Sequence, residues 1–142
     1  LLSGITLAQV GLGSVHGLAS PLGAFFPIPH GVVCGTLIAS ATRINIQSML
    51  AREPNNNALA KYLHVAEILC QEHFTDSRVA FNALIDLLAD WTNELALPRL
   101  CHYGLQETAF DKVIANCRGS SMKTNPIVLT DEEIRQVLLE RL

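Results

Sequence analysis

The first 42 residues contain no Asp, Glu, Lys or Arg, and this uncharged run constrains the fold more than any other feature of the chain. A helix that is apolar on all sides must lie inside a protein or a bilayer. Glycines, histidines and prolines interrupt the run before about 20 continuous apolar residues accumulate, which is the length that a membrane span needs. We therefore expect two helices buried within a globular domain, and we expect no insertion into a membrane.

The composition of the whole chain indicates one globular domain. Its 142 residues are enough to bury a core without disulfides or structural metals. Hydrophobic residues make up 49% and charged residues 16%, which excludes a disordered chain and a coiled coil. The formal net charge is -3, and Lys and Arg are scattered singly, so nucleic acid is excluded as a partner.

The start of the chain and its cysteines indicate the compartment. Leu1 lies in an apolar segment, without the basic region and cleavage site of a secretory signal, so we expect a fragment of a protein that is not secreted. The four cysteines lie far apart and form no C-x-x-C pair, a usage typical of a reduced cytoplasmic protein. We expect all four to be buried thiols: Cys34, Cys70, Cys101 and Cys117.

Helical periodicity and cap residues predict an all-α domain with about six helices. The expected helices cover residues 1–19, about 31–50, from the turn at 54–57 to Cys70, from a cap at Thr75 or Asp76 to Pro98, about 106–116, and from Thr130 onward. Three prolines within 21–29 are expected to prevent the first helix from continuing. Thr130 and Glu133 have the spacing of a capping box.

The apolar positions of these helices predict which faces meet the core. In the fourth helix the predicted core residues are Val79, Leu84, Leu87, Leu88 and Trp91. The glycines at 11, 13 and 17 do not form the G-x-G-x-x-G fingerprint of dinucleotide binding, because no strand precedes them and His16 occupies the third glycine position. We interpret them as glycines that let helices pack closely.

Two histidines stand out in GSVHGLASPLGAFFPIPHG, residues 13–31, because the stretch holds no other acid or base. Neutral imidazole is a good ligand for iron, zinc or nickel, and a proline-stiffened loop between two helices can bring His16 and His30 together. A divalent ion usually takes at least three protein ligands, often including a carboxylate, yet the first carboxylate is Glu53. Spacing by itself leaves two possibilities open: a structural pair, or part of a metal site completed by protein outside this chain.

The same stretch resembles the metal-binding block of the iron-containing alcohol dehydrogenases, G-x-x-H-x-x-A-H-x-x-G-A-x-x-x-x-P-H-G. Further on, LPRLCHYGL, FDKVIANC and KTNPIVLTDEEIRQVLLERL are similar to the closing helices and the Asn-Pro tail of that family. The resemblance therefore covers the whole chain. The tail departs from the family at Ile127, where an arginine often follows Asn-Pro.

The resemblance implies a fold and an activity. Residues 1–142 would be the single helical C-terminal domain of a two-domain enzyme with the dehydroquinate synthase-like fold, and an N-terminal α/β nucleotide-binding domain would precede Leu1. The intact protein would be a metal-dependent, NAD(P)-linked alcohol dehydrogenase that interconverts an alcohol and an aldehyde or ketone. A homo-oligomer is expected, and the chain alone is predicted to be inactive.

The resemblance also implies the site residues. His16 and His30 would be two of four ligands of Fe²⁺ or Zn²⁺, and an Asp and a His before Leu1 would supply the others. NAD or NADP would be bound mainly by the absent domain. Where the family commonly has a third histidine, near the nicotinamide and active in proton transfer, this chain has Ser20, which is the catalytic candidate and puts that role in question.

Five further residues are candidates for the wall of the substrate pocket: Leu7, Phe25, Phe26, Ser121 and Met122. Two alternatives to the alcohol dehydrogenase remain at this point. A related glycerol dehydrogenase or dehydroquinate synthase would share the two-domain plan and the histidine pair. A non-catalytic helical interaction domain would use His16 and His30 only for capping and packing.

Overall fold

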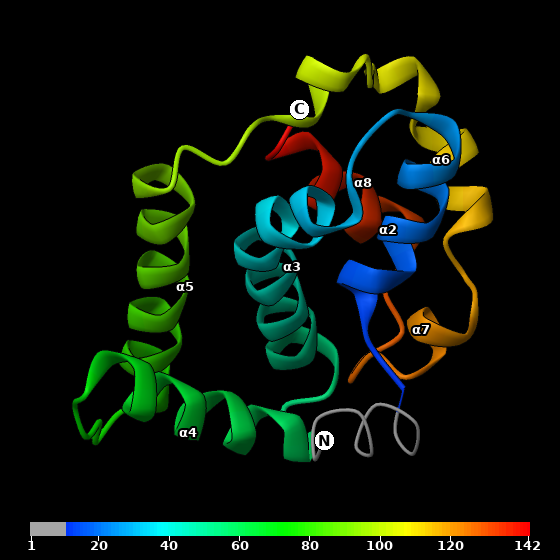
Figure 1. The fold of residues 1–142 in the computed structure, drawn as a ribbon. Coiled ribbons are helices and arrows are strands. Elements are labelled where there is room, and N and C mark those ends of the chain that lie inside the picture. Colours follow the sequence, from blue (N-terminus) through cyan, green and yellow to red (C-terminus); the bar gives the residue numbers. More distant parts are fainter. Residues whose placement is uncertain (1–10) are drawn as a thin grey trace.

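The structure is a computed structural model that describes residues 11–142, and over these residues the chain is helical and without strands (Figure 1). This confirms the predicted all-α fold. The helices are α2 (Ser14–Phe25), α3 (His30–Arg52), α4 (Asn57–Cys70), α5 (Ser77–Glu94), the 3₁₀ turns η1 (Leu100–Tyr103) and η2 (Glu107–Ala109), α6 (Phe110–Asn116), α7 (Ser120–Lys123) and α8 (Asp131–Leu139). None of the helices described is both long enough and apolar enough to cross a bilayer.

The central element is α3, which packs against α2 and α8 on one side and against α5 on the other (Figure 1). Its first half comes from the uncharged run, and Val33 and Leu37 are fully buried there. On α2, Leu18 and Leu22 are also fully buried. The expectation of two buried helices in this run is therefore confirmed for the described residues, with α2 and α3 as the pair.

The boundaries of the first helix differ from the prediction. Residues 1–10 lie outside the described part; Gly11 has a positive φ of 73° and Gly13 is the N-cap residue of α2, so neither lies within a helix. At the other end α2 continues through Pro21 to Phe25. Proline removes one backbone hydrogen bond and strains the preceding turn. Complete burial of Leu18 and Leu22 on α2 outweighs this cost, so the prediction that Pro21 would end the helix was wrong.

The helices α4 and α5, which pack against each other, begin at the predicted caps. The side chain of Asn56 accepts a hydrogen bond from the Ala58 N–H, and that of Asp76 accepts one from the Arg78 N–H. The predicted core face of α5 was partly wrong, because Val79 is 54% exposed and Trp91 is 40% exposed. Val79 lies five residues before the buried Leu84, which is about 140° around a helix and so away from the core.

The burial of the four cysteines agrees only in part with the prediction. Cys117 is buried as expected, but Cys34 and Cys70 are half-buried and Cys101 is exposed. Cys101 follows the fully buried Leu100 in the short turn η1, whose few residues cannot all face the core. All four thiols are free.

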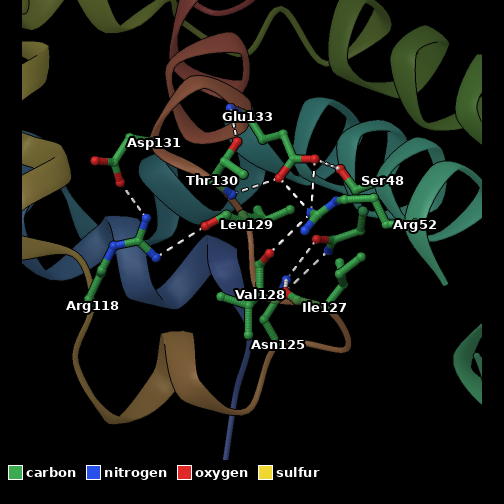
Figure 2. Close-up of polar contacts among 11 residues, drawn as sticks. Ser48, Arg52, Arg118, Asn125, Ile127, Val128, Leu129, Thr130, Asp131 and Glu133 are labelled. Carbon is green, nitrogen blue, oxygen red and sulfur yellow. Dashed lines mark hydrogen bonds and ion pairs between the residues drawn. The ribbon is translucent and has the colours of Figure 1, made fainter.

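A polar cluster joins the end of α3 to the start of α8 (Figure 2). Glu133 accepts hydrogen bonds from the Ser48 hydroxyl at 2.6 Å, from Arg52 Nη2 at 2.7 Å and from the Thr130 N–H at 2.7 Å. The Thr130 hydroxyl in turn accepts from the Glu133 N–H, which completes the predicted capping box. Burial raises the pKa of Glu133, but the bonds from Ser48, Thr130 and Arg52 outweigh burial and hold this pKa below its ordinary value of 4.5.

We expect this cluster to make stability depend on pH in acid. Because the pKa of Glu133 is lowered on folding, its contribution is complete above pH 4.5 and is lost as pH falls through the folded-state pKa. Glu133→Gln should lower the free energy of unfolding at pH 7 by about 1 kcal/mol, the usual value of a helix cap. In Glu133→Gln the free energy of unfolding, measured in urea, should also depend less on pH in the acid range than it does in Glu132→Gln. The latter variant is the control, because Glu132 is exposed. Parallel profiles for the two variants would contradict this assignment.

Candidate metal centre

His16 and His30 lie close together because α2 and the link after it have matching lengths. His16 is the third residue of α2, so its expected place near a helix end is corrected to a place near the start. From His16 to Phe25 the helix rises about 13.5 Å, and the four-residue link 26–29 can span about 16 Å from Phe25 to His30 when extended. Phe26 and Pro29 have extended backbones, so the link carries the chain back along α2 to the first residue of α3.

The two imidazole rings have their centroids 5.2 Å apart and are tilted by 55° to one another. His16 is half-buried between the helices, and His30 is exposed at the start of α3. The rings are therefore adjacent and open to solvent on the His30 side. This arrangement suits two ligands of one ion better than two histidines that only fill space in a core.

A third side chain, Cys34, completes the cluster. Its Sγ lies 3.8 Å from His16 Nε2 and 3.5 Å from His30 Nε2. Burial raises the pKa of the Cys34 thiol above its ordinary value of 9.0, so without a metal it is protonated at neutral pH. We predicted only a buried thiol here. The spacing in the sequence could have placed Cys34 beside His30, because residues four apart on a helix share a face and Cys34 follows His30 by four positions.

The donor atoms fit a metal ion. One nitrogen from each ring and the thiol sulfur all lie within 4.8 Å of one another, and among residues 11–142 no other His, Cys, Asp or Glu forms such a group. Around a tetrahedral ion with bonds of about 2.0–2.1 Å to nitrogen and 2.3 Å to sulfur, neighbouring ligand atoms lie about 3.4–3.6 Å apart. The two sulfur–nitrogen distances need a shift of only a few tenths of an ångström at most to meet that geometry.

Two small cavities border His16. One, of about 120 Å³, is lined by His16, Gly17, Ser20, Asn116, Cys117, Gly119, Ser120 and Ser121. The structure thus brings the candidates Ser20 and Ser121 to the same cavity as His16. The other, of about 220 Å³, lies on the side of Asn45, Tyr62 and Asn125. Both are smaller than the 300–1,000 Å³ typical of drug-sized ligand sites.

The remaining pocket candidates line neither of these cavities. Phe25 and Phe26 are half-buried and pack against the core, and the Lys112 ammonium lies 4.0 Å from the centre of the Phe25 ring. Met122 is buried against Gly17, where an added Cβ would approach its Cε to 3.0 Å. The packing role predicted for Gly17 is therefore confirmed. Leu7 lies outside the described residues.

Asn125, from the Asn-Pro tail, holds the start of the helix that carries His16. Its Oδ1 accepts a hydrogen bond from the Ser14 N–H at 2.9 Å, and this replaces the side-chain cap that Gly13 cannot supply. Its Nδ2 donates to Asn45 Oδ1 on α3 and to the Ile127 carbonyl, each at 2.8 Å, and Figure 2 shows the bond to Ile127. One side chain thereby joins α2, α3 and the tail.

Comparison with known proteins gives matches over nearly the whole chain. The model of the Fe-containing alcohol dehydrogenase family, C-terminal, matches residues 1–142. Alcohol dehydrogenase 4 of Schizosaccharomyces pombe is 29% identical over 138 residues, which is 96% of this chain and 30% of that protein. The 1-propanol dehydrogenase of Citrobacter freundii is 30% identical over 149 residues, or 99% of this chain and 38% of that protein.

A solved structure has the same fold. The crystal structure of a 1,3-propanediol oxidoreductase superimposes with a TM-score of 0.82 and 25% identity, and the match covers all of this chain and 36% of the other. The chain thus spans between 30% and 38% of the length of these three proteins. With a family match over every residue and the same helical fold, the chain belongs to the iron-containing alcohol dehydrogenase family and corresponds to its C-terminal part.

Proposed function

We propose that this chain is the metal-binding helical part of an NAD(P)-linked alcohol dehydrogenase, with His16 and His30 as two ligands of the catalytic ion. The observation that carries the proposal is the meeting of the two imidazoles, from the starts of α2 and α3, at a solvent-open point in a chain of this family. A histidine pair used only for packing would not need ring nitrogens that converge with a thiol within 4.8 Å.

In this proposal the residues of the chain hold and shape the site. When bound, a divalent ion polarises the oxygen of the alcohol or carbonyl, and NAD or NADP exchanges hydride with its carbon. His16 and His30 would donate ring nitrogens to the ion. Ser20 and Ser121 line the cavity beside His16, and their hydroxyls can donate to or accept from the substrate oxygen there. Iron or zinc would fit the imidazole ligands.

The substrate is proposed to be a short alcohol or the corresponding aldehyde or ketone. Two of the similar proteins are named for their action on 1-propanol and 1,3-propanediol. A cavity of about 120 Å³ beside His16 also suits a molecule of a few heavy atoms. We further propose that a nicotinamide-binding α/β domain and two more metal ligands, an Asp and a His, come from protein that precedes these helices.

The test uses the native protein that carries this chain, purified with its metal. We expect about one Fe or Zn per subunit and oxidation of short alcohols with NAD or NADP, while the 142-residue chain alone folds into helices and shows no turnover. Activity limited to glycerol, or dehydroquinate synthase activity, would favour a related enzyme. A native protein without stoichiometric metal would favour the non-catalytic helical domain and would contradict the proposal.

A further inference from the structure

We propose that Cys34 is a third metal ligand, so that this chain by itself offers a site of two imidazoles and one thiolate. The inference rests on the proposed role of His16 and His30 and extends it to a residue that the motif does not include. Cys34 is the fifth residue of α3, and one helical turn places it on the same face as His30. His16 reaches the same point from α2.

The geometry at Cys34 is that of a ligand shell. The thiol sulfur approaches Nε2 of both histidines, at 3.8 and 3.5 Å, instead of facing one hydrogen-bond partner. In the metal-free chain the thiol can donate to one Nε2 and accept from the N–H of the other ring, which holds the three atoms together. The same three atoms lie within 4.8 Å of one another, so a metal ion can replace these hydrogen bonds with bonds to all three.

The packing around the cluster keeps the three ligands in place. Four fully buried side chains hold α2 against α3: Leu18, Leu22, Val33 and Leu37. Cys34 itself is half-buried and His30 is exposed, so an ion can enter from solvent without unfolding the helices. The site therefore combines a rigid base with an open side from which further ligands can reach the ion.

Coordination changes the protonation of Cys34 and selects the metal. As the sulfur–metal bond forms, the S–H bond breaks and its proton passes to the buffer, so the bound sulfur is a thiolate. Its negative charge offsets part of the charge of a divalent ion in a cluster to which residues 11–142 contribute no carboxylate. Thiolate is a soft ligand that favours zinc over magnesium, calcium or manganese.

Zinc is the probe for the test, with the 142-residue chain kept reduced and free of oxygen. We expect one Zn²⁺ per chain, and X-ray absorption should show one sulfur neighbour at about 2.3 Å and nitrogen neighbours at about 2.0–2.1 Å. Cys34→Ser and Cys34→Ala should both lose the sulfur neighbour. Their zinc affinity, measured by competition with a chromogenic chelator, should fall by at least the 10–100-fold that loss of an outer-shell partner costs.

Cys101→Ser is the matched control, because Cys101 is a free thiol exposed on η1. It should keep both the sulfur neighbour and the affinity, and circular dichroism should show the same helix content in all variants. The inference would be overturned if zinc bound without a sulfur neighbour and if His16→Ala or His30→Ala, but not Cys34→Ser, weakened zinc binding. The proposed function would still stand in that case. Failure of the wild-type chain to bind zinc stoichiometrically would also overturn the inference. The proposed function fails separately, if the native protein holds no metal.

Discussion

Replacing His30 by alanine is expected to remove the bound metal from the native protein and to lower kcat for alcohol oxidation by about a thousandfold or more. Polarisation of the substrate oxygen by a metal ion is worth several kcal/mol, and each 1.36 kcal/mol corresponds to a factor of ten in rate. His30 is the exposed first residue of α3, so its side chain contributes little to the core and the helices should remain folded. Metal content, kcat and a thermal melt of the same sample measure all three expectations.

Two control variants separate the loss of a ligand from general damage. His64→Ala removes an imidazole whose side chain is 73% exposed on α4, and it should keep both metal and activity. Ser20→Ala removes the hydroxyl at the position where the family commonly has a third histidine. It should keep the metal, because the resemblance to the family assigns no ligand to that position. Stoichiometric metal and normal kcat in His30→Ala would show that His30 is not a ligand. Loss of metal in Ser20→Ala would contradict the residue-by-residue correspondence with the family.

Replacing Asn125 by alanine is expected to lower the free energy of unfolding by about 2–4 kcal/mol. The Ser14 N–H and the Asn45 side-chain oxygen would lose these partners, and each buried polar group left without one costs about 1–3 kcal/mol. Urea unfolding of the chain measures this change. Asn116→Ala is the control, because Asn116 is exposed and, among residues 11–142, its side chain bonds only to the Lys112 carbonyl one turn earlier. Its effect should therefore stay within about 0.5 kcal/mol.

The Asn125 variant also tests how the tail positions His16. Ser14 is the first residue of α2, and His16 follows two residues later, so release of the Ser14 N–H should let the start of the helix fray. Zinc affinity of Asn125→Ala should then fall together with stability. Asn125→Asp keeps the oxygen that accepts from Ser14 and loses the two hydrogen bonds that Nδ2 donates, so it should be intermediate. Equal stability of Asn125→Ala and wild type would contradict the role of this side chain.

Local signals in the sequence predicted most of the helices. Asn56, Asp76 and Thr130 cap α4, α5 and α8 as expected, because a cap depends on residues two or three positions away. The prolines before residue 30 and the turn at 54–57 likewise located α3. The family was recognised from the spacing of His16 and His30 and their flanking residues, and the match over residues 1–142 confirms it.

Features that depend on helix packing were missed or placed wrongly. The continuation of α2 through Pro21 follows from burial of the neighbouring side chains, which outweighs a local preference against proline. The exposure of Val79 depends on which side of α5 meets α3 and α4. Periodicity identifies an apolar face, but it does not say where a neighbouring helix ends or how far it covers that face.

The sequence by itself determined the helical class, the capped starts of three helices, the histidine pair and the family, because each rests on residues a few positions apart or on a fixed spacing. Only the tertiary structure decided that Cys34 lies between the two imidazoles and that Asn125 holds the N-terminus of α2. His16 and Cys34 are 18 positions apart, and Ser14 and Asn125 are 111 apart. Contacts over such separations depend on how whole helices dock, and docking is set by the summed burial of many side chains, which no local pattern encodes.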